Sequence, residues 1–386
     1  MKKLAIITSH PIQYNAPMFR LLAERKNIEI KVYYTWGKAV LENKYDPGFG
    51  KAISWDIPLL EGYDHEFVEN TAKDPGSHHF KGIVNPALIN NIKRWNADAV
   101  LLYGWAFDSH LKVMRYFHGK IPVLFRGDST LLNRQKNIKS IIRKFFLKWV
   151  YGNVDIALYV GSHNKAYFIN CGLKEQQLYF APHAIDNKRF GRLSVEQVTM
   201  SREQRSRLGV KDGDRVFLYA GKLDANKNVS LLAAAFATIA IPGTHLIIAG
   251  NGEDEQLLRS TYLNTPGIHF LPFQNQQQMP VLYSLADVFV LPSKAETWGL
   301  GINEAMAGGK AILASSGCAA AADLVRDGAN GYVFKSNDPA SLIEKMMMLI
   351  NDSNATALMG ATSLQMIRDW NFEETCKIIE QTMVFK

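Results

Sequence analysis

Two series of short apolar runs, each alternating with stretches of helical pattern, constrain the fold of this chain more than any other feature. The first series occupies Lys2–Thr8, Glu29–Tyr34, Asp98–Tyr103, Pro122–Phe125 and Asp155–Val160. The second occupies Val216–Ala220, His245–Gly250, Ile268–Leu271, Asp287–Leu291 and Ala311–Ser315. Strands that are apolar on both faces and alternate with helices form parallel sheets covered on both sides. The sequence therefore predicts an α/β protein with two doubly wound, Rossmann-like domains.

The domain limits follow from length and polarity. A chain of 386 residues is too long for one hydrophobic core. The polar segment Ser194–Arg215 is interpreted as a linker followed by the first turns of a helix, which predicts domains at 1–194 and 195–369. A terminal helix over about 370–386, with its apolar residues at helical spacing, is expected to complete the N-terminal domain. Two such domains facing each other predict a cleft at the carboxyl ends of their strands.

Composition narrows the class of partner. The net charge of +8 favours anionic partners such as nucleotides or acidic lipid, without choosing among them. Three cysteines without metal-ligand spacing indicate a reducing compartment and no structural metal. The apolar start of the chain is too short for a signal peptide, and the longest apolar run is broken by Pro242 and Gly243. A cytoplasmic location is the prediction.

The stretch ETWGLGINEAMAGG, from Glu296 to Gly309, carries the strongest chemical signal. It follows an apolar strand and places two glycines between Glu296 and Glu304, so backbone N–H groups there can approach a ligand closely. A helix start binds phosphate well, and carboxylates accept hydrogen bonds from vicinal sugar hydroxyls. The alternative is that Glu304 complements the helix dipole and that Glu296 is solvated.

A second cluster, YAGKLDANKNVSLL, places Lys222 and Lys227 just after another strand. Both ammonium groups could neutralise a diphosphate at the carboxyl end of the sheet. The alternative is a pair of ordinary surface lysines.

Together these segments resemble the retaining glycosyltransferases of family 4, which have the GT-B fold. The resemblance extends from about Val216 to Phe334 and rests on Gly221-Lys222-Leu223, Lys227-Asn228, Gly250-Asn251-Gly252, Asp287–Ser293 and Glu296-x7-Glu304. It implies that Lys222 and Lys227 contact the diphosphate of a nucleotide-sugar donor. It also implies that Glu304 binds the ribose and Glu296 the transferred sugar. The implied donor-binding set is Gly221, Lys222, Lys227, Phe273, Gln274, Glu296, Trp298, Gly299, Leu300, Gly301 and Glu304. Lys222 replaces the more usual arginine of the family and so loses its bidentate geometry.

The N-terminal half matches this family only loosely. His10, Gln13 and Tyr14 follow the first strand and are predicted to line the cleft, where contact with donor or with acceptor stays open. Arg126 and Asp128 follow a later strand, where the resemblance implies a position near the acceptor. All five are counted as acceptor-binding candidates. Asp128 could also accept a proton and is counted as catalytic together with Glu296, Lys222 and Lys227. The alternative for His10 is a hydrogen bond within its own loop.

The segment Arg134–Gly152 has an apolar side formed by Ile138, Ile141, Ile142, Phe145 and Trp149, and many lysines and arginines elsewhere. We expect an ordinary helix whose apolar side covers the N-terminal sheet and whose basic side is solvated. Contact of the basic side with an acidic membrane is the open alternative.

The sequence-based hypothesis is a retaining transferase that moves a hexose from a nucleotide-diphosphate sugar to an acceptor hydroxyl. Bacterial polysaccharide biosynthesis with a glycan or lipid-linked acceptor is implied by the resemblance, and no nucleic acid is expected as a partner. No metal or other cofactor is expected, because the two lysines and a helix N-terminus would stabilise the leaving diphosphate. A non-hydrolysing sugar-nucleotide epimerase and a non-catalytic nucleotide-sugar binding protein stay open as alternatives.

Overall fold

The computed structural model describes residues 1–38, 44–46, 51–132 and 138–384. The chain forms two compact units. Unit 1 contains Met1–Lys44, Ile57–His183 and Phe372–Lys386, and unit 2 contains Tyr45–Asp56 and Ala184–Asn371. The predicted boundary near residue 195 therefore lies inside unit 2, and unit 2 also takes a short segment from the first half of the sequence.

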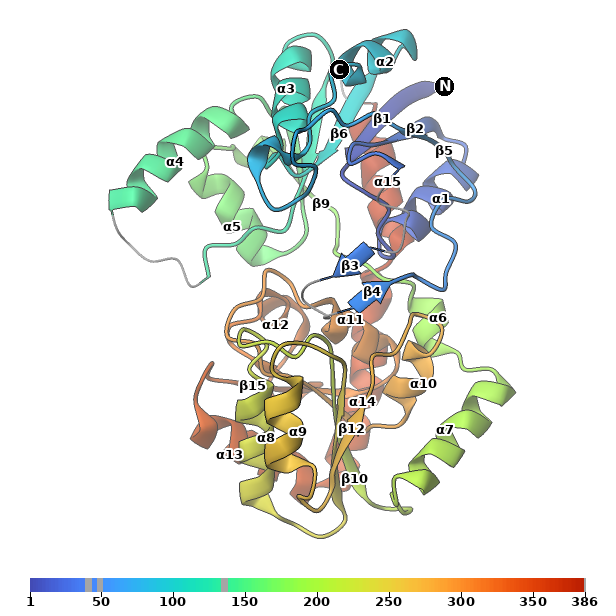
Figure 1. Cartoon of the computed structure of the whole chain (residues 1–386), viewed down its shortest axis with the longest axis vertical. Coiled ribbons are helices and arrows are strands. Elements are labelled where there is room, and N and C mark those ends of the chain that lie inside the picture. Colours follow the sequence, from blue (N-terminus) through green and yellow to red (C-terminus); the bar gives the residue numbers. More distant parts are fainter. Residues whose placement is uncertain (39–43, 47–50, 133–137, 385–386) are drawn as a thin grey trace. The chain divides into compact units, whose positions relative to one another are not determined.

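Unit 1 is built on a seven-stranded sheet in the order β5-β2-β1-β6-β7-β8-β9, in which every pairing is parallel (Figure 1). Its strands are β1 (Lys2–Thr8), β2 (Ile28–Tyr34), β5 (Asp64–Phe67), β6 (Ala99–Tyr103), β7 (Val123–Arg126), β8 (Ile156–Tyr159) and β9 (Leu178–Phe180). Successive residues of β1 belong to different apolar cores, Leu4 and Ile6 to one and Ala5 and Ile7 to the other. The sheet is therefore covered on both faces, as the sequence predicts.

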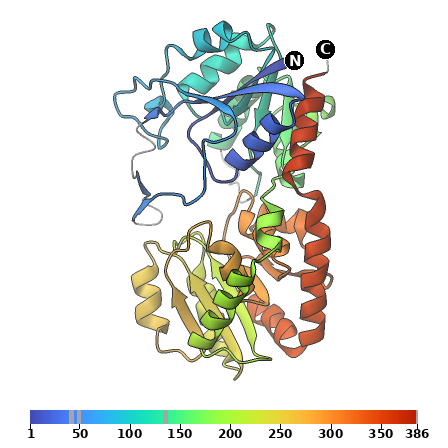
Figure 2. The same cartoon turned by 90° about the vertical axis from the view of Figure 1, so that its right-hand side faces the viewer.

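The helices of unit 1 divide between these two cores. They are α1 (Ala16–Glu24), η2 (Phe80–Gly82), α2 (Leu88–Arg94), α3 (Asp108–Phe117), α4 (Ile138–Tyr151), α5 (Ser162–Asn170), η3 (Glu175–Gln177) and α15 (Phe372–Thr382). The C-terminal helix α15 lies beside α1 in Figure 2, red against dark blue. The guanidinium of Arg25 donates to the Glu380 carboxylate at 2.6 and 2.8 Å, which ties the C-terminal helix to the end of α1.

Unit 2 holds a six-stranded parallel sheet in the order β12-β11-β10-β13-β14-β15. The strands are β10 (Arg215–Ala220), β11 (Thr244–Ala249), β12 (Ile268–Leu271), β13 (Val288–Leu291), β14 (Ala311–Ser315) and β15 (Gly331–Phe334). The helices are α6 (Asn187–Gly191), α7 (Val195–Arg207), α8 (Val229–Ile239), α9 (Glu255–Tyr262), α10 (Met279–Ser284), α11 (Leu300–Ala307), α12 (Ala319–Leu324), α13 (Pro339–Asn351), α14 (Ser353–Met366) and η4 (Ile367–Asp369). A separate two-stranded sheet pairs β3 (Lys44–Asp46) with β4 (Lys51–Ile53).

The strands that the sequence did not predict lie mostly at sheet edges. β5, β9 and β15 are three of the four edge strands, and each contains half-buried or exposed residues instead of a continuous apolar run. The fourth edge strand, β12, was predicted. An edge strand has a neighbour on one side only, so its sequence carries a weaker signal.

The structure corrects the prediction of a linker at Ser194–Arg215. Its first part is the 13-residue helix α7, which begins with a capping box between Ser194 and Gln197. Polar contacts attach it to α10, since Ser284 Oγ donates to Ser201 Oγ at 2.8 Å and Arg205 donates to the Leu285 carbonyl at 2.5 Å. Because this attachment uses little apolar area, the helix shows no clear hydrophobic periodicity.

The second correction concerns α4. Ile141, Ile142, Phe145 and Trp149 were expected to pack on the sheet, yet all four are exposed. The buried residues of the described part of α4 are Leu147, Val150 and Tyr151, all in its last two turns. The side chains of Ile138 and Lys139, and all of Lys136, lie outside the described residues.

Candidate functional site

The candidate site of unit 2 lies where the strand order changes direction. β10 is flanked by β11 on one side and by β13 on the other. In an open parallel sheet this arrangement leaves a crevice at the carboxyl ends of the central strands, where ligands bind. The segment that begins at Gly221 leaves β10 at this edge, and the segment that leads to Glu296 leaves β13 beside it.

The loop after β10 is ordered by its own polar groups. The Asp224 carboxylate accepts hydrogen bonds from the backbone N–H groups of Asn226 at 3.0 Å and Lys227 at 2.9 Å. The Tyr219 hydroxyl donates to the Lys222 carbonyl at 2.5 Å. These contacts fix the backbone that carries both lysines. Sequence reasoning missed Asp224, although an aspartate ahead of a turn is a recognisable capping signal.

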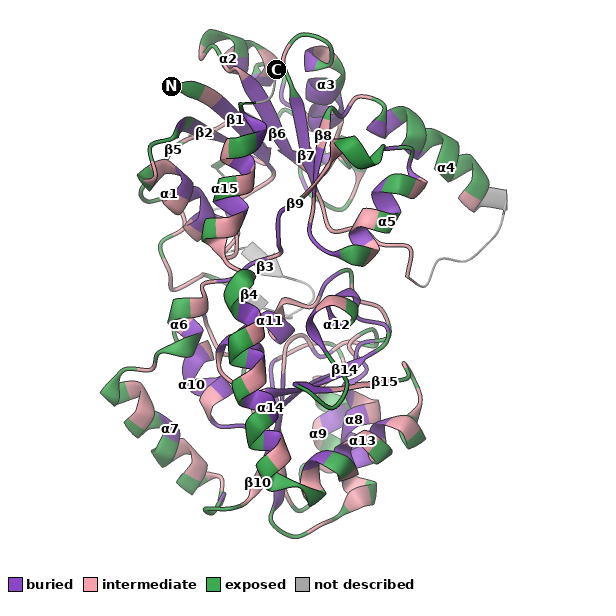
Figure 3. Ribbon diagram, turned by 180° about the vertical axis from the view of Figure 1, so that it is seen from behind, coloured by how far each residue is buried: buried purple, intermediate pink, exposed green. Residues whose placement is uncertain are grey.

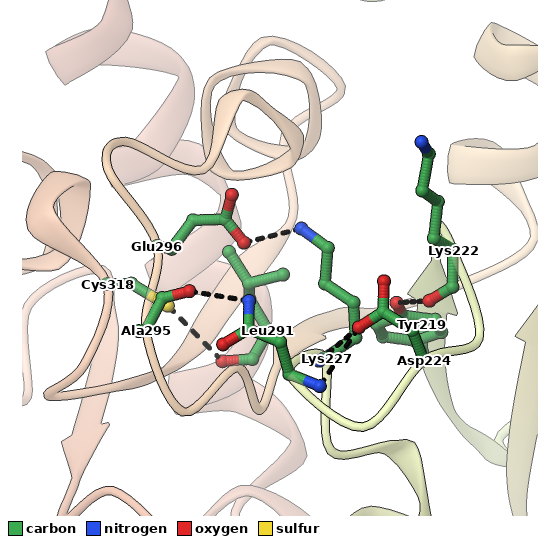
Figure 4. Close-up of polar contacts among 9 residues, drawn as sticks. Tyr219, Lys222, Asp224, Lys227, Leu291, Ala295, Glu296 and Cys318 are labelled. Carbon is green, nitrogen blue, oxygen red and sulfur yellow. Dashed lines mark hydrogen bonds and ion pairs between the residues drawn. The ribbon is translucent and has the colours of Figure 1, made fainter. Parts of the chain in front are cut away.

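The Lys227 ammonium is paired with the Glu296 carboxylate Oε2, as the dashed line in Figure 4 shows. Both side chains are about four-fifths buried, with exposed fractions of 21% and 19%. The two loops are also joined through the backbone, since Asn226 Nδ2 donates to the Ala295 carbonyl at 2.7 Å. The Lys222 side chain extends away from this pair in the same view. The structure thus brings together Lys227 and Glu296, which are distant in sequence.

A third loop, between β14 and α12, supports Glu296 from behind. Glu296 N–H donates to the Gly317 carbonyl at 3.0 Å, and the Glu296 carbonyl accepts from Ala319 N–H at 3.2 Å. A Cβ atom on Gly317 would lie 2.2 Å from the Lys294 carbonyl oxygen, so only glycine fits there. Burial raises the pKa of the neighbouring Cys318 thiol to about 12, so this cysteine is not a thiolate nucleophile at neutral pH. The sequence analysis had not singled out this loop.

The helix α11 begins directly after Gly299, whose φ of 105° is favourable only for glycine. Leu300 and Gly301 form its first turn, and Glu304 lies one turn further with 2% of its surface exposed. The Tyr283 hydroxyl donates to Glu304 Oε2 at 2.7 Å and orients this buried carboxylate.

Trp298, a predicted donor contact, has a structural role in unit 2. Its indole N–H donates to Asn303 Oδ1 at 2.9 Å, and its ring stacks on Trp370 with the centroids 5.3 Å apart. It is 3% exposed. A donor contact of Trp298 stays a prediction.

The glycines at the end of β11 allow two loops to meet. Gly250 has a φ of 145°, and a Cβ atom there would lie 1.9 Å from the Gly221 carbonyl oxygen. Leu223 N–H donates to the Asn251 carbonyl at 2.9 Å. The Gly250-Asn251-Gly252 segment therefore supports the lysine loop through backbone contacts.

Phe273 and Gln274, which belong to the predicted donor-binding set, follow β12. Phe273 N–H donates to Asn251 Oδ1 at 2.9 Å. The Trp55 ring lies 6.3 Å from the Phe273 ring, and Gln277 Nε2 donates to the Asp56 carbonyl at 2.5 Å. Trp55 and Asp56 come from the first half of the chain, and sequence reasoning did not connect them with this loop.

The predicted acceptor residues lie in unit 1. β1 occupies the switch point of its sheet, between β2 and β6, and His10, Gln13 and Tyr14 follow its carboxyl end. His10 Nδ1 lies 2.8 Å from Ser9 Oγ, and the His10 ring packs edge-on against Trp36. A contact between these residues and an acceptor stays a prediction.

Arg126 is 6% exposed, and its guanidinium donates to the carbonyls of Ala181 and Pro182, both at 2.9 Å. It therefore joins the end of β7 to the segment after β9. Burial, with the nearby Arg126 charge, lowers the pKa of His183 to about 4, so this histidine is neutral at pH 7. The acceptor role of Arg126 and the catalytic role of Asp128 stay predictions.

Two groups of side chains contain the atoms that commonly bind metal ions. Among the described residues, Asp74, His78 and His79 offer ligand atoms within 4.8 Å of one another, but the His78 and His79 rings already hydrogen-bond to Asp74.

The second group is an Asp-x-Asp tripeptide, Asp212–Asp214, which the sequence-based prediction overlooked. It precedes β10, at the amino end of the strand, and Asp214 bonds Lys211 N–H and His245. It therefore lies at the opposite end of the strand from Lys222.

Within the described ranges, the structure contains no helix long and apolar enough to cross a membrane.

Residues 200–365 match the family of glycosyl transferases group 1. The chain is 24% identical over 181 residues to sulfoquinovosyl transferase SQD2 of Arabidopsis thaliana, covering 45% of this chain and 35% of that protein. It is 25% identical over 207 residues to a D-inositol 3-phosphate glycosyltransferase of Salinispora tropica, covering 50% and 43%. The matched stretch spans less than half the length of both relatives.

Solved structures match over nearly the whole chain. Sucrose-phosphate synthase of Thermosynechococcus elongatus has a TM-score of 0.73 at 17% identity and covers 99% of this chain and 98% of its own. The HepE protein of Anabaena, in complex with UDP, has a TM-score of 0.73 at 16% identity and covers 99% of both chains. This chain has the GT-B fold of glycosyltransferases, which confirms the predicted fold.

Proposed function

We propose that this protein is a retaining glycosyltransferase that moves a hexose from a nucleotide-diphosphate sugar to an acceptor hydroxyl. The observation that carries the proposal is the juxtaposition of Lys227 and Glu296 at the switch point of the unit 2 sheet. A cation and a sugar-binding acid are thereby placed together where an α/β sheet binds its ligand. The UDP complex of the Anabaena neighbour supports the nucleotide-sugar donor.

Each group then has a chemical role. Lys222, Lys227 and the start of α11 stabilise the charge that develops on the leaving diphosphate. Glu296 accepts a hydroxyl of the transferred sugar, and Glu304 accepts the ribose hydroxyls, because buried carboxylates are strong acceptors. Lys227 and Glu296 neutralise each other before the donor enters, so neither charge is left buried alone.

In the proposed front-face reaction the bond between the anomeric carbon and the diphosphate oxygen breaks. The acceptor oxygen forms the new bond on the same face, and the departing phosphate takes the proton of the acceptor. No protein nucleophile is needed, and metal independence is part of the proposal. A role in bacterial surface glycan synthesis, with a glycan or lipid-linked acceptor, completes it.

The first test measures thermal unfolding with UDP, GDP, ADP and CMP. A nucleotide at one hundred times its dissociation constant adds about 2.7 kcal/mol of stability, which is readily detected. One diphosphate should stabilise the native protein, and Glu304→Gln should lose most of that gain. Glu344→Gln, an exposed acid in α13, is the matched control and should keep it. If no nucleotide stabilises the native protein at millimolar concentration, the donor site is wrongly assigned.

A second measurement separates transfer from the alternatives. Nucleoside diphosphate released only when an acceptor is added indicates transfer. Conversion of the donor sugar without release indicates an epimerase. Binding with neither outcome across a panel of acceptors indicates a non-catalytic binding protein.

A further inference from the structure

The helix α4 exposes an unusual number of large apolar side chains. The exposed fractions are 57% for Ile141, 66% for Ile142, 68% for Phe145, 43% for Phe146 and 47% for Trp149. These five residues fall within nine consecutive positions of one helix. A contiguous apolar patch of this kind marks an interaction site in a water-soluble fold.

The spacing places the patch on one side of the helix. At 100° per residue, positions 141, 142, 145, 146 and 149 span an arc of about 140°. Leu147, Val150 and Tyr151, which anchor α4 in the core of unit 1, lie on the opposite side. The exposed apolar side therefore faces away from the unit that carries it. In Figure 3 most of the α4 ribbon is green, the colour of exposed residues.

Positive charge borders the patch on both edges. Arg143, Lys144 and Lys148 are all exposed, and the helix sequence IKSIIRKFFLKWVY contains no acidic residue. The Arg115 guanidinium of α3 lies 5.3 Å from the centre of the Trp149 ring, which adds a further cation beside the patch. Trp149 combines an apolar ring with a polar N–H group, a combination suited to a membrane–water interface.

We infer that α4 binds the surface of an anionic lipid bilayer, lying in the interface with its apolar side among the acyl chains. Its lysines and arginines then meet the lipid phosphates. A second copy of the chain is a poorer occupant, because face-to-face packing of two such helices brings like charges together. The inference rests on α4 alone and does not depend on the proposed transferase activity.

Vesicle flotation of the full chain tests the proposal. We expect binding to vesicles of phosphatidylcholine with about one third phosphatidylglycerol, little binding to phosphatidylcholine alone, and weaker binding in 0.5 M NaCl (about three times the physiological ionic strength). Phe145→Ser, and separately the pair Lys144→Glu and Lys148→Glu, should each lower the partition coefficient about tenfold. Leu358→Ser is the matched control, because Leu358 is equally exposed at 68% but lies on α14 of unit 2.

Three results would overturn the inference. The first is that the native protein fails to float with anionic vesicles, and the second is that Phe145→Ser floats as well as the native protein. The third is that Phe145→Ser converts a dimer into a monomer in sedimentation while the native protein ignores vesicles, which would make α4 a contact between copies. The thermal unfolding midpoint of Phe145→Ser, measured without any ligand, serves as the folding control and keeps this test independent of the donor site.

Discussion

The ammonium of Lys227 contacts the carboxylate of Glu296, although the two residues are 69 positions apart in the chain. They lie on two loops that leave the neighbouring strands β10 and β13. Each residue is therefore held in place by the other before any ligand arrives. Under the proposed function, a diphosphate that enters this site would compete with Glu296 for Lys227 and would free the carboxylate for a sugar hydroxyl. The pair is thus expected to act as a preorganised receptor.

Removal of either charge should affect function more than folding. We expect Lys227→Ala and Glu296→Gln each to lower transfer activity about 100-fold, because both act on groups that change charge or position in the reaction. The free energy of unfolding should fall by about 2 kcal/mol, between the values for exposed and for fully buried ion pairs, because the remaining charge is left largely buried without its partner. Activity assays and urea titrations measure the two effects. Lys345→Ala removes a cation of similar exposure, paired with Glu344 at 3.0 Å, and should leave activity unchanged.

The contact between Tyr283 and Glu304 should matter for nucleotide affinity. Tyr283→Phe removes the 2.7 Å hydrogen bond that orients the buried carboxylate but keeps the packed ring. We expect the dissociation constant of the nucleoside diphosphate to rise about fivefold, which corresponds to about 1 kcal/mol. Calorimetric titration measures it. An unchanged dissociation constant would mean that Glu304 does not contact the nucleotide or does not need the hydrogen bond from Tyr283.

Gly250→Ala should distort the neighbouring loop that carries Lys222 and Lys227. The new Cβ atom would lie 1.9 Å from the Gly221 carbonyl oxygen, and the φ of 145° is unfavourable for alanine. We expect a loss of about 3 kcal/mol in unfolding free energy and weaker nucleotide binding. Gly119→Ala is the control, since Gly119 also has a positive φ, of 73°, but a Cβ atom there meets nothing within 4 Å. It should cost about 1 kcal/mol and leave binding intact.

Acid should destabilise the protein partly through His110. Burial lowers the pKa of this histidine to about 4, although its hydrogen bond to the Gly104 carbonyl opposes the shift. Below pH 6.5 the unfolded chain takes up a proton at this position and the folded chain does not until about pH 4. Stability should therefore fall by about 1.4 kcal/mol for each pH unit across that window.

Urea unfolding at several pH values between 7 and 4.5 measures this slope. His110→Gln should flatten the slope, whereas His118→Gln, at an exposed position, should not. An identical slope in both variants would assign the acid sensitivity to other groups.

The sequence predicted the interior strands well because they are apolar on both faces. The interior strands β1 and β14 and the edge strand β12 have the predicted limits, and most of the other predicted strands differ by one residue at an end. Three edge strands, β5, β9 and β15, and the helix α7 escaped prediction because half-exposed strands and hydrogen-bonded helices do not need a strong apolar pattern. For the site, the sequence predicted Lys222, Lys227, Glu296 and Glu304 as candidates, since charged residues in the segments after buried strands are conspicuous, and their roles stay predictions.

The sequence by itself determined the fold class and the candidate residues, because periodicity and strand-end chemistry are local properties of the chain. Only the tertiary structure decided which of those residues meet. It paired Lys227 with Glu296, placed Tyr283 on Glu304 and set Gly317 behind the acidic loop. It also decided the orientation of α4, whose apolar side faces outward. Periodicity shows that a helix has an apolar side. Which side of α4 packs on the core is decided by the contacts of Leu147, Val150 and Tyr151.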